Sequence, residues 1–491
     1  MNKAVALFLI MLLAVLSIVA VGVQNGWLKT PQKEPFYVGV TYCGNSTQEA
    51  ITLIDKVKDY SNLFVLQSGV IQGNPEQITE ICDYAVSSDM YFMVYFGLAH
   101  SIFMQQWLNN TTGRWGDHFL GVYYCDENGG KMLDYDRPFF DEATLSSLVK
   151  QMDGSVTGFR VDNYTTATYW PDGRIKLTIS EPPTSPFEPR NETVVEYYTN
   201  GTIIATNILE EYNPRATIYD SNQSAGLIFE QVPPPKITIL ENYNTTYTYD
   251  ELWNMRPFQT YDETAERFTN RYYNSLIQFT NAGKNITAIT SDYVLYWFDY
   301  KSGYNVILAQ LGWNHTLAQD IALVRGAATL QNKPWGAIIT WKYNNPPYLD
   351  SGEAIYNQMR MAYEAGATYV VIFNYAEDMT GPYGTLQEEH FSALERFWNQ
   401  VVQSPFTEKG STKAEAVLVL PKNYGWGMRT PEDRIWGIWS ADDKSQQIWQ
   451  ISRSLLEKYD LHLDVVYEDP EFTVNDYYSK VYYWNQTGYV E

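Results

Sequence analysis

Two adjacent carboxylates, Asp126 and Glu127, follow directly after an apolar, aromatic run that begins at His118 and ends at Cys125, and a Gly129-Gly130 pair comes next. The run is typical of a buried β-strand, and such a strand needs no acidic residues at its end in order to fold. In a parallel barrel, the carboxyl ends of the strands lie at the open mouth, where these folds carry their functional groups. The alternative is structural: Asp126 accepts backbone N–H groups in the turn, and Glu127 is solvated.

The chemistry that a carboxylate pair can perform is acid–base work on a glycosidic bond. Such hydrolysis needs a protonated acid at the leaving oxygen and a second carboxylate that acts as nucleophile or base. We expect Glu127 to be the acid, since the negative charge of Asp126 and the aromatic surroundings of Tyr123 and Tyr124 would raise the pKa of Glu127.

The second carboxylate is predicted to be Asp292, with Asp126 as the other candidate. Asp292 ends a later predicted strand, which would be the neighbour of the first in a barrel; its alternative role is to cap a helix or turn. Asp299 stands in the aromatic cluster 296–300, which either lines the rim of the mouth or packs in the interior.

Further polar and aromatic residues at predicted strand ends are candidates for substrate binding, because indole rings stack on sugars and amides bind hydroxyls. The alternative for each aromatic residue is ordinary packing. These candidates are Gln310, Trp313, Trp341, Lys342, Tyr343 and Asn374, with Glu377 and Asp378 close behind the last.

Short apolar strands alternate with amphipathic helices from Phe36 onward, which predicts an α/β fold, a (β/α)8 TIM barrel with eight parallel strands. The expected strands are 36–43, 62–68, 91–97, 118–125, 286–293, 305–313, 336–341 and 368–375. The expected helices are 47–60, 76–88, 261–281, 317–331, 352–366 and 388–403.

A long insertion separates the fourth and fifth strands, since roughly 160 residues lie between them, far more than an ordinary loop contains. It starts with a predicted helix at 141–152 and then turns β-rich, with hairpin turns at 169–173 and 198–201. A lid or glycan-binding wall is one possibility for it, and decoration without a ligand is the other.

The chain divides by these patterns into four predicted parts. A small α/β module is expected at the end, with strands at 416–421, 461–467 and 480–484 around a helix at 444–459, and with only three strands it should lean on the barrel. The parts are an N-terminal anchor or signal (1–30), the barrel (36–410), the β-rich insertion (130–260) and a flavodoxin-like module (411–491).

Composition excludes several classes of function. A formal net charge of −23 makes nucleic acid and anionic membrane surfaces poor partners, because they are bound by clustered Lys and Arg. The five histidines form no His-x-x-x-His pair, and Cys-x-x-Cys, P-loop and Gly-x-Ser-x-Gly motifs are missing. The sequence therefore predicts no metal and no cofactor.

The N-terminus predicts an extracytoplasmic protein. Ala4 to Val23 carry no charge and are long enough to cross a bilayer, so we expect an uncleaved anchor on the extracellular face, with a cleaved signal and secretion as the alternative. Eleven Asn-x-Ser/Thr sites support export and predict a glycoprotein. Cys43 and Cys125 could pair at the mouth, but we expect free thiols.

The eight-strand pattern, the Asp126-Glu127 pair after the fourth strand and the C-terminal α/β module resemble the (β/α)8 glycoside hydrolases, particularly β-galactosidase-like enzymes with a flavodoxin-like domain behind the barrel. Many of these place an Asn-Glu acid on the fourth strand and a nucleophilic Glu on the seventh. The resemblance carries over only Glu127, because the seventh strand here ends in Trp341-Lys342 without a carboxylate. The Asn- and Tyr-rich style also resembles archaeal surface proteins.

Together these features predict an extracytoplasmic glycoside hydrolase-like barrel that acts on carbohydrate. The alternative, from another class of function, is a catalytically inactive surface protein that binds glycans or supports the cell envelope. A second carboxylate about 5 to 9.5 Å from Glu127 across an open cleft favours hydrolysis.

Overall fold

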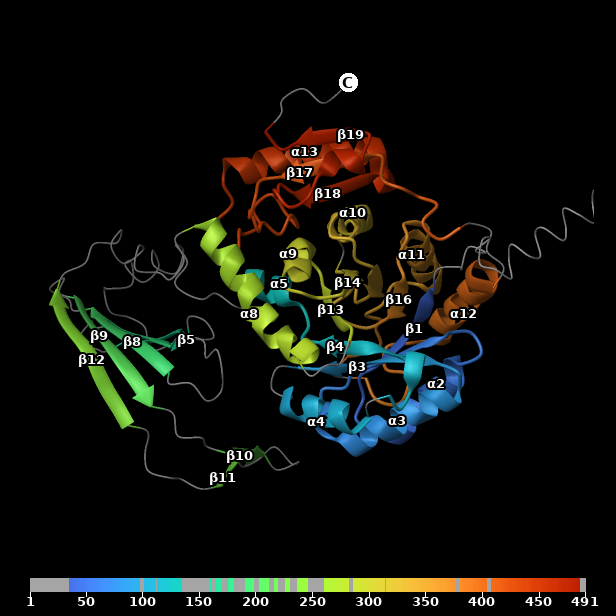
Figure 1. Ribbon diagram of the computed structural model, residues 1–491, viewed down its shortest axis with the longest axis horizontal. Helices are drawn as coiled ribbons and strands as arrows, with labels where there is room; N and C mark the ends of the chain where they lie inside the picture. The colour runs from blue at the N-terminus through green and yellow to red at the C-terminus, as the bar shows by residue number, and fades with distance from the viewer. Residues whose placement is uncertain are drawn as a thin grey trace, which may run out of the picture. The chain divides into compact units, whose positions relative to one another are not determined.

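The computed structural model describes most of the chain beyond the N-terminal segment (Figure 1). The described residues are 35–97, 101–111, 113–134, 260–281, 286–313, 315–376, 379–403 and 408–485, with eight strand segments between 159 and 245. The predicted anchor lies outside these residues. No helix within them is long and apolar enough to cross a membrane.

Eight parallel strands close into a barrel, in the order β1-β16-β15-β14-β13-β4-β3-β2. This confirms the predicted TIM-barrel fold, and each strand lies inside its predicted range except β15, which starts one residue earlier. The strands are β1 (Tyr37–Tyr42), β2 (Leu63–Leu66), β3 (Tyr91–Phe96), β4 (Phe119–Tyr124), β13 (Ala288–Asp292), β14 (Val306–Leu311), β15 (Trp335–Ile339) and β16 (Tyr369–Ile372).

Helices follow the strands and surround the barrel (Figure 1). Ser46 caps the first of them and Asn74 caps the second, where Pro75 occupies the first turn, as expected for helix starts. The helices are α2 (Thr47–Val57), α3 (Pro75–Ser87), α4 (Ser101–Thr111), α5 (Asn128–Asp134), α8 (Tyr261–Asn281), α9 (Tyr296–Lys301), α10 (Leu317–Leu330), α11 (Gly352–Glu364) and α12 (Glu388–Phe397), which continues as a π-helical turn to Gln403.

Three of these helices, α4, α5 and α9, are absent from the prediction. Gly129 and Gly130, expected as a turn, instead lie in the first turn of α5. A Cβ on Gly130 would collide with the ring of Tyr293, and one on Gly129 would crowd Leu295. Glycine is therefore present because α5 packs closely against the loop after β13, and its flexibility does not decide the structure here.

The barrel interior is filled by apolar side chains from alternating strand positions. Leu63, Met93, Ile289, Leu308 and Val371 belong to one buried cluster that spans the strands. Because side chains two residues apart in a strand share a face, the residues that follow this cluster toward the carboxyl ends also point inward. Those positions form the floor of the mouth.

The segment between β4 and β13 contains antiparallel strands. A six-stranded sheet has the order β12-β9-β8-β7-β6-β5, and β10 pairs with β11. The strand pairs that flank both predicted turns, β6 with β7 and β8 with β9, are antiparallel as predicted. The predicted helix at 141–152 lies outside the described residues. The strands are β5 (Phe159–Arg160), β6 (Thr165–Tyr169), β7 (Ile175–Ser180), β8 (Arg190–Tyr197), β9 (Ile203–Glu211), β10 (Ala216–Tyr219), β11 (Gly226–Phe229) and β12 (Lys236–Thr245).

The C-terminal part is a parallel sheet of order β18-β17-β19, with β17 (Ala416–Leu420), β18 (Leu463–Tyr467), β19 (Lys480–Tyr483) and helix α13 (Asp443–Tyr459). It packs on α10 of the barrel, as expected from its size. Arg325 is buried there and donates from Nε to Oδ1 of Asp464 at 2.8 Å and from Nη2 to the carbonyl of Leu461 at 2.6 Å.

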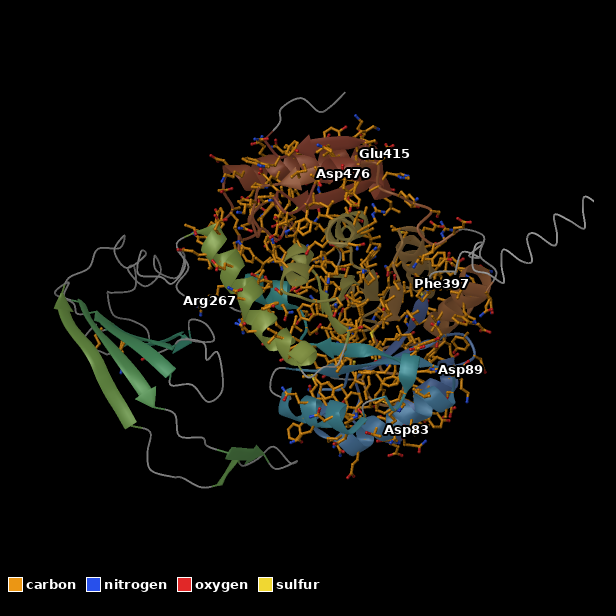
Figure 2. The ribbon with its side chains drawn as sticks, in the orientation of Figure 1. Asp83, Asp89, Arg267, Phe397, Glu415 and Asp476 are labelled. Atoms are coloured by element: carbon orange, nitrogen blue, oxygen red, sulfur yellow. The ribbon has the colours of Figure 1, made fainter. Side chains whose placement is uncertain are left out.

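Carboxylates labelled in Figure 2 lie on the barrel helices and on the C-terminal part. Asp89, Glu415 and Asp476 are exposed, and Asp83 on α3 is half-buried. Exposed carboxylates of this kind contribute to the net charge of −23. The carboxylates at the barrel mouth are different, because they are partly or fully buried.

Candidate active site

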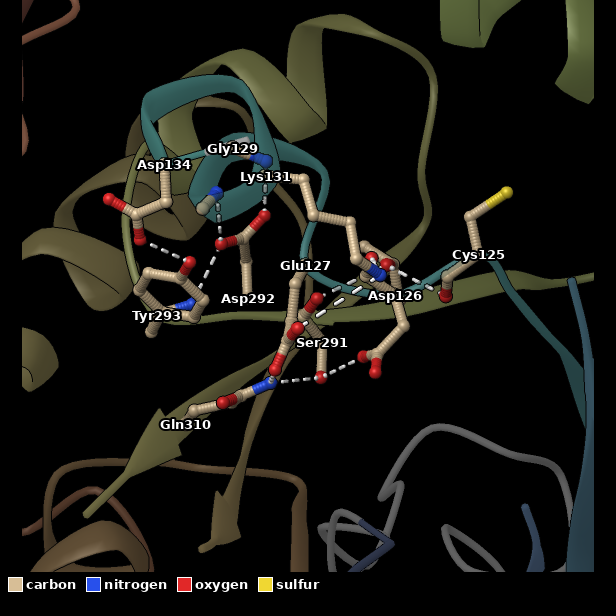
Figure 3. Close-up of polar contacts among 12 residues, drawn as sticks. Cys125, Asp126, Glu127, Gly129, Lys131, Asp134, Ser291, Asp292, Tyr293 and Gln310 are labelled. Atoms are coloured by element: carbon tan, nitrogen blue, oxygen red, sulfur yellow. Dashed lines mark hydrogen bonds and ion pairs between the residues drawn. The ribbon is translucent and has the colours of Figure 1, made fainter. Parts of the chain in front are cut away.

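The candidate site lies where β4, β13 and β14 end (Figure 3). The chain makes a sharp turn after β4, in which Cys125 and Glu127 both have positive φ angles, +56° and +57°. This left-handed conformation is uncommon for residues with a side chain. Here the backbone N–H of Glu127 donates to the carbonyl of Ser291 at 2.8 Å, which ties the turn to the neighbouring strand.

Glu127 points across the mouth toward β14 (Figure 3). Its Oε1 accepts a hydrogen bond of 2.9 Å from the amide of Gln310, and its Oε2 is 3.9 Å from the ammonium of Lys131. About a quarter of the side chain, 26%, is exposed. The carboxyl group is therefore oriented by protein contacts and still accessible to solvent.

Asp126 points toward two hydroxyl groups of the barrel interior. Its Oδ1 accepts from Tyr123 and from Ser291, both at 2.6 Å, and these two hydroxyls are 2.7 Å apart. The amide of Gln67, from the end of β2, donates to the Tyr123 hydroxyl at 3.3 Å. The network holds one carboxyl oxygen of Asp126 in place from three strands.

Two side chains connect the carboxylates. The Gln310 amide that binds Glu127 also donates to Oγ of Ser291 at 3.0 Å, and Ser291 donates to Asp126. The three consecutive distances of 2.9, 3.0 and 2.6 Å keep Oε1 of Glu127 and Oδ1 of Asp126 closer than the ~9.5 Å upper limit for carboxylate pairs in glycosidases.

Burial raises the pKa of both carboxyl groups. For Glu127 the pKa rises to about 7, first through burial and then through the charge of Asp126, while the Gln310 amide and Lys131 act in the opposite direction. Burial also raises the pKa of Asp126 above its usual range. The pair shares one mouth, so ionisation of one carboxyl disfavours ionisation of the other.

Asp292 has a different environment, because four backbone N–H groups donate hydrogen bonds to it. Oδ2 accepts from Gly129 at 2.5 Å, and Oδ1 accepts from Gly130, Tyr293 and Val294 at 3.0, 2.8 and 3.2 Å. The side chain is fully buried, and burial raises its pKa to about 6 against these N–H contacts. The geometry is that of a cap on the first turn of α5, the alternative role expected from the sequence.

Asp299 is not brought to the rim. It lies in α9, is fully buried, and its carboxyl group faces Asn128 and the carboxyl group of Asp292 in the interior. Burial, followed by the charge of neighbouring Asp292, raises its pKa far above the usual range. A carboxyl group in this setting is kept neutral and has no path to a substrate at the mouth.

The predicted aromatic residues form a shelf beside the acid, which we name the Trp313–Trp341 shelf. The indole N–H of Trp313 donates to Oε1 of Gln310 at 3.1 Å, and the rings of Trp313 and Trp341 are 5.7 Å apart at an angle of 59°. Trp341 is fixed by a 2.6 Å bond from its indole N–H to the carbonyl of Tyr375. Both indoles are half-buried, and the ring of Trp341 also packs against that of Tyr348, with centroids 4.9 Å apart.

The remaining predicted residues lie farther along the rim or below it. Lys342 pairs with Asp350 at 2.9 Å, and Tyr343 next to it is 41% exposed. Asn374 is buried, and its Oδ1 accepts from Thr41 at 3.3 Å, so it joins β16 to β1 beneath the mouth. Glu377 and Asp378 lie outside the described residues.

Tyr123, Ser291 and Lys131 are contact residues that were not predicted as members of the site. Lys131 donates to the backbone carbonyl of Asp126 at 2.6 Å. A signal for Ser291 exists in the sequence: it stands two residues after Ile289, an interior residue, so it must also face inward. A hydroxyl at an interior position next to a predicted site is the pattern that could have identified it.

Two free thiols, Cys43 and Cys125, follow β1 and β4 at the rim, as expected. Burial raises the pKa of both to about 12. Cys82, in α3, is also free. These thiols stay protonated and are poor nucleophiles. Within the described part of the chain, His, Cys, Asp and Glu side chains form no cluster suited to a metal ion.

Comparison with known proteins adds no relative: no protein-family model matches this chain, and no curated protein matches it. The geometry of the mouth is therefore the basis on which a function can be assigned.

Proposed function

We propose that this protein is a glycoside hydrolase in which Glu127 protonates the leaving oxygen of a glycosidic bond. The observation that carries the proposal is the environment of Glu127, a carboxyl group with a pKa raised to about 7, partly exposed at the mouth of a barrel. A carboxylic acid with this pKa is protonated in roughly half of the molecules at neutral pH and can transfer that proton, which is the requirement for a general acid.

Asp126 is the second carboxylate of the proposed pair. It is linked to Glu127 through Ser291 and Gln310, which keep the two carboxylates closer than the ~9.5 Å upper limit for glycosidase pairs. One of its oxygens accepts from two hydroxyls, which leaves the other to activate water or attack the sugar. Asp292 is a weaker candidate for this role because the α5 backbone occupies both of its oxygens.

The substrate class proposed for this site is a neutral carbohydrate. The Trp313–Trp341 shelf offers indole faces for a sugar ring, and Gln310 bridges the shelf to the acid. Lys131 and Lys342, the cations next to these groups, already contact the carbonyl of Asp126 and the carboxylate of Asp350. An anionic sugar would therefore meet carboxylates whose neighbouring cations are already engaged.

The proposal includes the setting and the domain relationship expected from the sequence. The uncharged segment 4–23 and the eleven glycosylation sites support an extracytoplasmic glycoprotein, tethered at the N-terminus or secreted. The C-terminal parallel sheet with α13 supports the likeness to a flavodoxin-like domain behind a β-galactosidase-like barrel.

A second candidate function is glycan binding without catalysis. It is favoured by two observations: Tyr123 and Ser291 donate hydrogen bonds to Oδ1 of Asp126, and Asp292 caps α5. Both carboxylates that could assist Glu127 are therefore engaged in contacts within the protein. The aromatic shelf would serve either function equally well.

A panel of neutral, amino and acidic oligosaccharides separates the two functions. The full-length protein is incubated with each sugar, and both binding and released product are measured. Product that disappears in Glu127→Gln supports hydrolysis, with Glu415→Gln, an exposed carboxylate on the C-terminal sheet, as the matched control. Binding without product from the wild-type protein would establish the second function.

A further inference from the structure

Helix α5 connects the candidate acid to the C-terminal part of the chain. Glu127 directly precedes the helix, and its carbonyl accepts the backbone N–H of Lys131 at 2.8 Å in the first turn. A seven-residue helix is too short to be stable alone, so contacts at its two ends must hold it. Asp292 supplies the contact at the first end.

Arg429 supplies the contact at the other end. It belongs to the β17–α13 loop (residues 421–442), and its two terminal nitrogens donate to both carboxyl oxygens of Asp134, the last residue of α5, at 2.7 and 2.9 Å. The same guanidinium donates from Nε and Nη2 to Asp433 at 2.8 Å each. One planar cation thus joins a carboxylate of α5 to a carboxylate of its own loop, which the fork of an arginine allows and a lysine does not.

Tyr293 completes the contact. Its hydroxyl donates to Oδ2 of Asp134 at 2.7 Å (Figure 3), and the Arg429 guanidinium lies 5.7 Å from the centre of its ring. Tyr293 follows Asp292 directly in the chain. The residues that cap the start of α5 and those that hold its end are therefore connected through the end of β13.

The β17–α13 loop also packs against the body of α5. A Cβ on Gly437 would collide with the carbonyl of Met132, and one on Gly427 would crowd the side chain of Leu133. Gly437 has a positive φ of +69°, a conformation that glycine adopts without strain. Leu133 is almost completely buried by this packing. The β17–α13 loop therefore contacts three consecutive residues of α5, Met132, Leu133 and Asp134.

We propose that Arg429 is a positioning residue for Glu127, and that the β17–α13 loop of the C-terminal part is thereby a working component of the barrel site. The assignment to catalysis rests on the proposed function; the coupling between Arg429 and Glu127 does not. The loop holds α5, and α5 holds the left-handed turn that presents the Glu127 carboxyl group to Gln310.

Two measurements that need no substrate test this coupling. Trp313 is hydrogen-bonded to Gln310, and Gln310 is hydrogen-bonded to Glu127. The fluorescence of Trp313, obtained as the difference between the wild type and Trp313→Phe, therefore reports on ionisation of Glu127. Glu127→Gln identifies the titration step that belongs to Glu127. Hydrogen exchange of residues 128–134 reports directly on the stability of α5.

In Arg429→Ala, we expect the Glu127 titration midpoint to fall by about half a pH unit or more, since burial is the main cause of its raised pKa and a loosened helix admits water. Exchange in α5 should become about tenfold faster or more. In Arg429→Lys, the Glu127 midpoint and the exchange in α5 should both lie between those of Arg429→Ala and the wild type. Arg114→Ala is the control, because Arg114 likewise donates two hydrogen bonds to one carboxylate, that of Asp83 in α3. This substitution should change neither the Glu127 midpoint nor the exchange in α5.

Asp134→Asn provides a second variant that keeps the Arg429–Asp433 pair and should reproduce the effects even if Arg429→Ala fails to fold. A folded variant of either kind with unchanged α5 exchange and an unchanged Glu127 midpoint would overturn the proposal. If the wild-type protein releases no product from any sugar while these effects are present, the proposed function fails and the positioning role of Arg429 stands.

Discussion

Gln310 donates one amide hydrogen bond to Glu127, at 2.9 Å, and this contact joins the acid to the aromatic shelf at the barrel mouth. The same side chain accepts from Trp313 at 3.1 Å. The relationship sets both the direction in which Glu127 points and the ease with which it loses its proton, because an N–H donor stabilises the ionised carboxylate.

Replacement of Gln310 by Leu should raise the pKa of Glu127 above about 7, since the amide donor lowers it in the wild type. The alkaline limb of the activity profile should move up by about half to one pH unit. The profile of kcat/KM against pH is the measurement, and Gln446→Leu, an exposed glutamine on α13, is the control. A limb that stays in place or moves down would show that Gln310 does not control the ionisation of Glu127.

Stability should depend on pH through Glu127 in a direction opposite to that of most carboxylates. The folded pKa of about 7 lies above the ordinary value of 4.5, so the folded state binds more protons between these values, and the free energy of unfolding falls as pH rises through this window. Glu127→Gln removes the effect.

The variant should therefore match the wild type near pH 4 and exceed it near pH 8 by up to about 3 kcal/mol. Urea unfolding of both proteins at these pH values measures the difference. A difference that is the same at acid and alkaline pH would contradict the raised pKa.

Asp292→Asn should destabilise the fold by about 2 kcal/mol, because an amide keeps one acceptor oxygen and turns an NH2 group toward the N–H groups of α5. The free energy of unfolding from urea titration tests this, with Asp443→Asn in the exposed first turn of α13 as the control. Unchanged stability together with lost turnover would instead return Asp292 to the catalytic pair.

The barrel could be predicted from the sequence because its strands are apolar, regularly spaced and separated by amphipathic helices. The short helices could not. Helix α5 has Gly129-Gly130 in its first turn, a pattern typical of a turn, and Asp292, far away in sequence, accepts hydrogen bonds from both N–H groups. Local preference was overruled by a contact between two strand ends.

The sequence predicts part of the candidate site, because the positions of strand ends can be read from the apolar pattern. Strand ends indicate which residues reach the mouth, and Asp126, Glu127, Gln310 and Trp313 lie there together. Strand ends do not show which carboxylate faces backbone N–H groups, so Asp292 was expected to be catalytic and lies under α5. For Asp299 the sequence leaves both the rim and the interior open, and α9 places it in the interior.

Trp341→Ala should weaken sugar binding about tenfold through the lost stacking face, with little effect on the Glu127 titration. Calorimetry with the best ligand of the oligosaccharide panel gives the dissociation constant, and Tyr477→Ala, an exposed aromatic of the C-terminal part, is the control. Unchanged affinity would mean that the shelf serves packing alone.

The central claim is that Glu127 transfers a proton to a glycosidic oxygen, and turnover by Glu127→Gln tests it most directly. The amide is nearly the same size but has no proton to give, so product release should fall by at least about a hundredfold while the affinity for the sugar is kept. Glu415→Gln should retain wild-type turnover. Turnover in Glu127→Gln equal to that of the wild type would contradict the account.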